Sequence, residues 1–289
     1  MTASVGAYAP AVDTRSFLGL EATVDPLRWR LPVRTPLTTG GGFLFGGAGL
    51  AAAIEALEAA TRRPLVWATA QYLSYALPPS VLDLDVTVAV AGRQTAQARV
   101  VGRVGDQEIF TVNAALGSRP LEATGEWAVR PEVADPASCP PQQDLDGHDG
   151  TIMSQVDVRL ASARDVGDLD GALGDGRSAL WARVEGLECG AGLLAILGDW
   201  VPFGIGQALG QRAGGNSLDN TLRVVRLVPT EWVLLDIRIH GIANGFGHGL
   251  VHLWSEDGTL LATASQSVIV RFWDDARRRP AGSGDSPQR

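Results

Sequence analysis

The hydrophobic pattern in the first half of the chain predicts one helix followed by several strands. From Phe45 to Ala60 the sequence is rich in alanine and leucine, which favour a helix, and its glycines allow other backbone to approach closely. Runs rich in β-branched residues, separated by turn residues, follow it and are typical of antiparallel strands. We expect these strands at 65–73, 83–90, 95–104 and 108–116, with a short strand at 21–24 before the helix.

The second half repeats this order of elements. From Cys189 to Leu197 it contains the Gly-Ala-Gly-Leu sequence of the first helix and is apolar nearly all round, which predicts a helix buried on most sides. Strands are expected after it at 217–228, 232–241, 247–255 and 260–272, and before it at 179–184.

The spacing of corresponding residues indicates that the two halves are a duplication. Asp106 and Asp257 lie in the turns before the last strands, and Val66 and Ser217 lie in the first strands after the helices. In both pairs the two residues are 151 positions apart. This order of elements predicts an α+β fold in which each antiparallel sheet wraps round its helix and the two copies cover each other's sheet edges.

Composition also suggests where the domains begin and end. The segment 131–150 is rich in Pro, Asp and Gln, which indicates a linker. We therefore expect a first domain at 1–130 and a second at 151–275. The tail, 276–289, combines an arginine run with Gly, Ser and Asp, and we expect it to be disordered because it cannot bury enough apolar surface.

Charge and motif content exclude several classes of function. The net charge of −8 argues against nucleic acid as a partner, and a chain without lysine cannot carry a P-loop. No apolar run reaches the roughly 18 residues that span a bilayer without a charge or a glycine, and 1–10 lacks the features of a secretion signal. A cytoplasmic location is therefore expected. Cys139 and Cys189 have no metal-binding spacing, so we expect no metal and no cofactor.

Five short sequences occur in a familiar order over about 20–272. They are Phe45-Gly46-Gly47, Asp106 to Phe110, Ser217 to Thr221, Glu231-Trp232 and Asp257 to Gln266. Together they resemble type II acyl-CoA thioesterases. The resemblance implies a double hot-dog fold with two tandem units, and hydrolysis of acyl-CoA to a free fatty acid and CoA. By analogy with hot-dog proteins, which expose sheet edges, it also implies a homodimer or a higher homo-oligomer.

The resemblance further implies a trio of residues in the second unit that activates a water molecule. The aspartate of the trio is matched by Asp199, the hydroxyl residue by Ser217 and the glutamine by Gln266. Three family features differ here. The usual histidine of the first unit is absent from 66–72, and the usual histidine after the Ser-x-Asp sequence is Asn220. The Arg-Pro sequence that normally follows is also loosened, to Arg226-Leu227-Val228-Pro229.

These residue types suit thioester hydrolysis. A carboxylate such as Asp199, in an otherwise apolar helix, is expected to have a raised pKa and to act as a general base. An inward-facing amide such as Gln266 is costly to bury unless it is hydrogen-bonded, which favours a site role. Backbone N–H groups of Gly190 and Ala191, at the mouth of a helix, are candidates to bind the carbonyl oxygen. An apolar slot for the acyl chain is expected to be lined by two aromatic residues, Trp200 and Phe203.

Other interpretations of the same residues remain open. Asp199 can simply end a helix before Pro202, Ser217 can be a turn residue, and Asp219 is a second candidate carboxylate. Three histidines invite a metal-site interpretation, but no carboxylate is placed as a further ligand: His240, His248 and His252. A non-catalytic acyl-CoA-binding or scaffold protein of the same fold is one alternative function. A hot-dog dehydratase is another, although no histidine lies near either predicted helix.

Overall fold

The structure is a computed structural model, and it describes residues 12–143 and 148–273. Its first half contains two helices, α1 and α2, and strands β1 to β6. Their bounds are α1 Thr14–Leu18, β1 Glu21–Ala22, β2 Arg28–Val33, α2 Gly46–Thr61, β3 Leu65–Tyr72, β4 Ser80–Ala91, β5 Thr95–Val104 and β6 Gln107–Gly117. Each predicted strand of this half is present, and β2 is an additional one.

The second half contains α3 and α4 and the remaining strands. Their bounds are β7 Val156–Ser162, β8 Arg177–Val184, α3 Ala191–Leu197, α4 Val201–Leu209, β9 Ala213–Ser217, β10 Asp219–Val224, β11 Val233–Ala243, β12 Phe246–Ser255 and β13 Leu260–Phe272. The strand predicted at 217–228 is divided into β9 and β10 at Leu218, where the chain changes register against β13.

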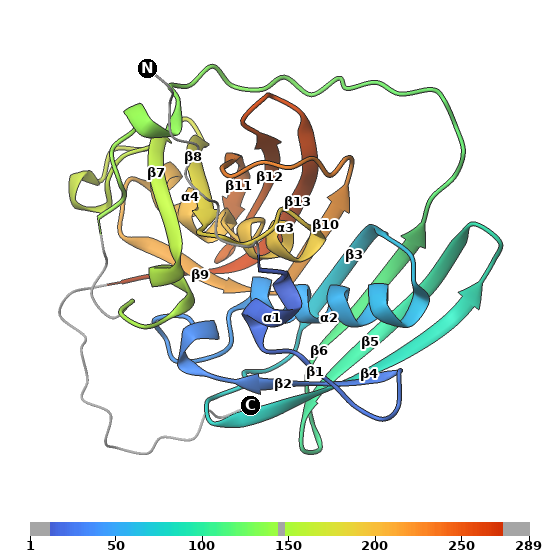
Figure 1. The fold of residues 1–289 in the computed structure, drawn as a ribbon. Helices are drawn as coiled ribbons and strands as arrows, with labels where there is room; N and C mark the ends of the chain where they lie inside the picture. Colours follow the sequence, from blue (N-terminus) through green and yellow to red (C-terminus); the bar gives the residue numbers. More distant parts are fainter. Residues whose placement is uncertain (1–11, 144–147, 274–289) are drawn as a thin grey trace, which may run out of the picture.

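All of these strands join one continuous antiparallel sheet that wraps round the helices (Figure 1). The strand order is β1-β2-β4-β5-β6-β3-β10-β13-β12-β11-β8-β7, and β9 pairs with β13 off this path. The order β2-β4-β5-β6-β3 of the first half is therefore repeated as β8-β11-β12-β13-β10 in the second. The two halves meet where β3 pairs with β10, and the hydroxyls of Thr69 and Thr221 lie 2.9 Å apart across this seam.

The buried helices show which segments correspond between the halves. Within the first half, α2 contacts β2 to β6, and within the second half α4 contacts β8, β9, β11, β12 and β13. Helix α3 packs instead along α2, and all seven of its residues are buried, as predicted. The Gly-Ala-Gly-Leu match therefore paired α2 with the wrong helix, since α4 holds the corresponding position.

Small residues explain why this sequence is shared by α2 and α3. A Cβ atom on Gly47 of α2 would lie 2.8 Å from the carbonyl oxygen of Ala195 of α3, so only glycine allows the two helices to approach this closely. A Cβ atom on Gly192 of α3 would likewise lie 2.5 Å from Thr14 and 2.8 Å from Glu55. The repeated glycines thus mark a tight helix–helix contact and not an equivalence between the two helices.

The segment after β6 forms a strap, defined here as 118–143, that crosses to the outer face of the second half (Figure 1). The indole N–H of Trp181 donates to the carbonyl of Ala134 at 2.9 Å, and the guanidinium of Arg130 lies 5.4 Å from the Trp181 ring. Under the strap lies a second apolar cluster: Cys139, Ala179, Trp181, Trp232, Leu234, Trp254 and Leu260. Much of the predicted linker, 131–150, is therefore packed against the second half.

Two sequence expectations fall partly on residues that the structure leaves undescribed. The predicted tail, 276–289, lies outside the described residues, as do 144–147 of the predicted linker.

One apolar stretch, Ala191–Leu209, is long enough to cross a membrane by length and composition, but 78% of its most apolar window is buried inside the protein. It comprises α3 and α4, which form part of the core.

Candidate active site

Asp199 lies in the break between α3 and α4. Helix α3 ends at Leu197, with Gly198 as its C-cap, and Pro202 stands at the start of α4, where proline is tolerated because its missing N–H would have no helical partner. The Asp199 side chain is only 6% exposed and points at the start of α2. There the Gly47 N–H donates to Asp199 Oδ2 at 2.6 Å, so the carboxylate caps the positive end of the α2 dipole.

Ser217 and Gln266 meet the other carboxylate oxygen of Asp199. The Ser217 hydroxyl donates to Asp199 Oδ1 at 3.4 Å, and Gln266 Nε2 donates to the same atom and, at 3.0 Å, to Ser217 Oγ. The amide orientation of Gln266 is fixed because the Val201 N–H donates to Gln266 Oε1 at 3.2 Å. Three residues from distant stretches of the sequence, one of them at the end of β9 and one in the middle of β13, are thus brought into direct contact.

The environment of Asp199 changes its protonation. Burial raises the pKa of Asp199 to about 7, while the hydrogen bonds from Gln266, Gly47 and Ser217 act in the opposite direction. The carboxyl group therefore changes charge close to neutral pH. A group with such a pKa is suited to accept a proton and then to return it.

The first half contributes two residues that the sequence pattern did not assign to the site. A Cβ atom on Gly46 would lie 2.8 Å from Asp199 Oδ2 and 3.0 Å from the Tyr72 hydroxyl, so no side chain fits at Gly46. The Phe45-Gly46-Gly47 sequence was a usable signal for this helix mouth, since glycines permit such close approach. No local signal marked Tyr72, because its place beside Asp199 depends on the pairing of β3 with β10.

The other expected site residues divide into two groups. Trp200 adjoins Asp199 and is buried against Phe45, with ring centroids 6.1 Å apart, and Phe203 follows in the first turn of α4. Gly190 and Ala191 lie at the opposite end of α3 from Asp199, and the helix between is about 10 Å long. The helix mouth that faces the trio is that of α2, so the structure does not bring Gly190 and Ala191 to it.

Comparison with known proteins agrees with this architecture. A family model of the acyl-CoA thioesterase C-terminal domain matches residues 136–270. A proposed thioesterase from Novosphingobium aromaticivorans is 35% identical, with a TM-score of 0.77, over 86% of this chain and 97% of its own. The chain belongs to the acyl-CoA thioesterase family.

Solved structures with lower sequence identity share the hot-dog fold of this chain. Acyl-CoA thioesterase II of Mycobacterium marinum is 18% identical, with a TM-score of 0.70, over 90% of this chain and 98% of its own. A hot-dog protein from Alicyclobacillus acidocaldarius is 19% identical, with a TM-score of 0.77, over 89% of this chain and 97% of its own. No protein of curated function matches the chain.

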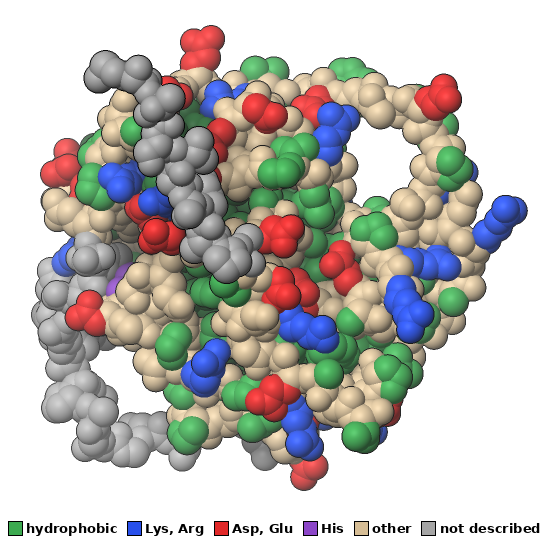
Figure 2. Space-filling view, viewed as in Figure 1, with side chains coloured by type: hydrophobic (Ala, Val, Ile, Leu, Met, Phe, Trp, Pro, Cys, Tyr) green, Lys and Arg blue, Asp and Glu red, His purple; other side chains and the backbone are tan. Residues whose placement is uncertain are grey.

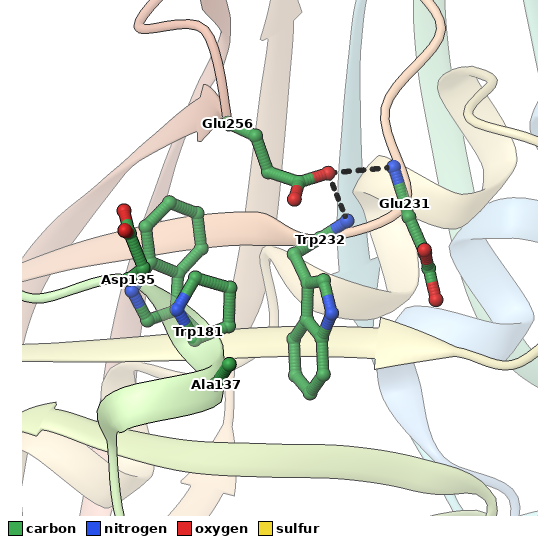
Figure 3. A pocket seen from close by; sticks show the side chains of 7 residues that line it. Asp135, Ala137, Trp181, Glu231, Trp232 and Glu256 are labelled. Atoms are coloured by element: carbon green, nitrogen blue, oxygen red, sulfur yellow. Dashed lines mark hydrogen bonds between the residues drawn. The ribbon is translucent and has the colours of Figure 1, made fainter. Parts of the chain in front are cut away.

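A surface pocket of about 240 Å³ lies away from the trio in this thioesterase family member (Figure 3). It lies between the strap and the outer face of the second half and is lined by Asp135, Pro136, Ala137, Trp181, Glu231, Trp232 and Glu256. Glu256 accepts the N–H groups of Glu231 and Trp232, each at 3.1 Å, and Arg183 bonds to Glu231 and covers the Trp232 ring. None of Asp199, Ser217 and Gln266 lines this pocket, so it is not part of the candidate active site.

His248 and His252 of β12 contact residues outside the trio. His248 contacts the hydroxyl of Ser267 at 3.2 Å, and His252 lies 3.6 Å from the Asp236 carboxylate. These partners belong to the face of the sheet opposite to α4. Within 12–143 and 148–273, no three His, Cys, Asp or Glu side chains are arranged to hold a metal ion.

Proposed function

We propose that this chain is an acyl-CoA thioesterase that hydrolyses acyl-CoA to a free fatty acid and CoA. Asp199, Ser217 and Gln266 are the catalytic trio of the proposal. The observation that carries it is the mutual contact of a buried carboxylate, a hydroxyl and an amide at the mouth of α2. Membership of the acyl-CoA thioesterase family supports the choice of substrate class.

In the proposed reaction Asp199 takes a proton from a water molecule as the water oxygen bonds to the thioester carbonyl carbon. The carbonyl π electrons move to its oxygen and give a tetrahedral intermediate. The C=O bond then re-forms, the C–S bond breaks, and the leaving sulfur takes the proton from the Asp199 carboxyl group. The products are the fatty acid and the CoA thiol, and Asp199 is again a carboxylate.

The neutral partners of Asp199 suit this role. The Ser217 hydroxyl and the Gln266 amide orient the carboxylate and the water without adding a charge that would hold the Asp199 pKa far from neutrality. A positioned general base contributes about 10²- to 10⁴-fold to the rate of such a reaction. Trp200 and Phe203, beside the trio, are proposed to line the slot for the acyl chain.

The proposal extends to the architecture and assembly. We propose a double hot-dog made of unit 1–130 and unit 151–275, joined by 131–150. The repeated strand order and the corresponding positions of α2 and α4 support two tandem units. A cytoplasmic homodimer or higher homo-oligomer, free of metal and cofactor and acting in fatty acid metabolism, completes the proposal.

A panel of acyl-CoA esters of increasing chain length, with thiol release as the readout, tests the activity. Asp199→Asn is expected to reduce kcat by at least about 10²-fold because the general base is lost. Asp219→Asn is the matched control: Asp219 accepts the Ser267 N–H at 2.8 Å, and asparagine keeps that acceptor. Full activity in Asp199→Asn, or loss only in Asp219→Asn, contradicts the trio. Acyl-CoA binding without turnover by the wild type would indicate the scaffold alternative.

A further inference from the structure

Two buried polar side chains beside the trio form no hydrogen bond of regular geometry with any described residue. Asn220 of β10 is 1% exposed, and neither its Oδ1 nor its Nδ2 is bonded to any described residue. The hydroxyl of Tyr72 in β3 is buried and is also without a partner in the described part of the chain. Buried polar groups are nearly always hydrogen-bonded, so adjacent unpaired groups require an explanation.

The seam of the sheet directs both side chains to the face that carries the trio. Asn220 pairs with Ala70 of β3, and Ala70 is buried on the helix side of the sheet. Thr221 pairs with Ser265 in antiparallel strands. The residue before Thr221, which is Asn220, therefore lies beside the residue after Ser265, which is Gln266. Tyr72 is two residues from Ala70 and therefore lies on the same face.

Gly46 connects this pair directly to Asp199. The Tyr72 hydroxyl and Asp199 Oδ2 both lie within 3.0 Å of the position that a Cβ atom on Gly46 would take. Burial and the nearby Asp199 carboxylate raise the pKa of Tyr72 well above its usual value, and the Asn220 side chain, close enough to interact with the phenol through a hydrogen bond, acts in the opposite direction. The phenol therefore stays protonated at neutral pH and remains a hydrogen-bond donor.

Hydrolysis of a thioester requires donors for the carbonyl oxygen as negative charge develops on it. The Gly47 N–H at the helix mouth is already used by Asp199. The Tyr72 O–H and the Asn220 Nδ2–H are neutral and buried, and neither forms a hydrogen bond of regular geometry with any described residue. Neutral donors in a site shielded from water stabilise such a charge more strongly than they would in solvent.

We propose that Tyr72 and Asn220 together form the binding site for the thioester carbonyl oxygen, with one donor supplied by each half of the chain. This inference rests on the proposed function and names two catalytic residues in addition to the trio. The carbonyl oxygen accepts from both donors as the tetrahedral intermediate forms, and both bonds are released when the fatty acid leaves.

The first part of the test measures turnover in Tyr72→Phe and Asn220→Ala. Each variant removes one donor, and each is expected to lower kcat by about 10²- to 10³-fold with little change in KM or in Tm. Tyr75→Phe and Asn113→Ala, at exposed positions, are matched controls and are expected to keep wild-type kcat. Full activity in both Tyr72→Phe and Asn220→Ala overturns the inference.

The second part measures affinity for two acyl-CoA analogues that cannot be hydrolysed. In the ketone analogue a methylene replaces the thioester sulfur, and in the thioether analogue a methylene replaces the carbonyl. The wild type is expected to bind the ketone about tenfold more tightly, because two hydrogen bonds depend on its oxygen. Tyr72→Phe and Asn220→Ala are expected to lose that preference while their affinity for the thioether is unchanged. A purely structural role would leave the preference intact, and that result overturns the inference.

Asp199→Asn separates failure of the inference from failure of the proposed function. It is expected to abolish turnover yet retain the ketone preference, because both carbonyl donors remain. A wild type that hydrolyses acyl-CoA, with Asp199→Asn inactive but no ketone preference in any variant, refutes the carbonyl site alone. A wild type that shows the preference but hydrolyses no acyl-CoA refutes the proposed function and leaves the carbonyl site standing.

Discussion

The two halves of the chain share a strand order but differ in chemistry. At the seam Thr69 pairs with Thr221, so corresponding residues there are 152 positions apart and not 151. With this offset Asp199 corresponds to Gly47 and Gln266 to Ala114, so small apolar residues stand in the first half where the second carries polar ones. The first half nevertheless contributes to the site through the mouth of α2 and through Tyr72. A duplicated unit without a trio of its own can thus complete the site of its neighbour, because the seam joins the two sheets edge to edge.

The largest expected effect comes from removing the side-chain amide of Gln266, whose corresponding residue in the first half is Ala114. Gln266→Leu, of similar volume, is expected to lower kcat by about 10²- to 10³-fold because Asp199 loses its amide donor. Ala114→Ser, which adds a hydroxyl at the corresponding buried position, is the matched control and should leave kcat within a few-fold of the wild type. Steady-state kinetics on one acyl-CoA checks both variants. Equal losses of kcat in the two would contradict the proposal that only the second half carries the polar trio.

A second large effect is expected at the helix mouth of the first half. Gly46→Ala is expected to lower kcat by about 10²-fold, because its Cβ atom would displace the Asp199 carboxylate and the Tyr72 hydroxyl. Gly190→Ala at the start of α3 is the control, since a Cβ atom there meets no atom within 4 Å. Unchanged kinetics in Gly46→Ala would show that the first half is only a scaffold.

The pH dependence of kcat/KM distinguishes the buried carboxyl groups of the two halves. Asp199 in the second half and Glu55 in α2 each have a pKa raised to about 7, with burial as the main cause. Because a general base works only when deprotonated, kcat/KM should rise with pH up to about 7 and fall about tenfold for each pH unit below it. Glu55→Gln is expected to keep this pH profile of kcat/KM. If the profile disappears in Glu55→Gln, the titrating group is Glu55 of the first half and not Asp199.

Glu55 is instead expected to affect stability. Its pKa is about 7 in the folded chain and ordinarily 4.5, so between these values the folded state holds a proton that the unfolded state has lost. The free energy of unfolding should therefore decrease as pH rises from 4.5 to 7, and the loss is complete above pH 7. After allowance for solvent screening, Glu55→Gln is expected to stabilise the chain by about 1–2 kcal/mol at pH 8, but not at pH 4. Urea unfolding at the two pH values measures this, and equal effects at both would contradict it.

The smallest effect concerns the strap, which covers the outer face of the second half only. Trp181→Phe removes the indole N–H that donates to Ala134, and it should lower the free energy of unfolding by about 1 kcal/mol without changing kcat. Chemical denaturation and steady-state kinetics provide the two readouts. A loss of activity would connect the strap to the site.

Figure 2 shows acidic and basic side chains interspersed on one face of the molecule, without a large area of one sign. The net charge of −8 is therefore not gathered there into one region. That face therefore presents no extended basic surface.

Much of the fold could be predicted because local patterns decide it. The strands Thr95–Val104 and Leu260–Phe272 have the predicted bounds, since β-branched residues run between clear turns. β2 and β7 were missed: arginine and proline interrupt the apolar alternation of β2, and charged residues interrupt that of β7. The division at Leu218 also went unforeseen, because it arises from the register of β13 and not from any turn residue.

By itself the sequence determined the repeated order of elements, the three polar types of the trio and the glycines of the helix mouths. Local propensity and periodicity are properties of neighbouring residues, so they can be recognised from the sequence alone. Only the tertiary structure decided that α4 corresponds to α2, that the mouth of α2 rather than that of α3 faces Asp199, and that Tyr72 and Asn220 lie beside it. Those relations depend on the pairing of β3 with β10 and on close helix packing, which bring together residues far apart in the chain.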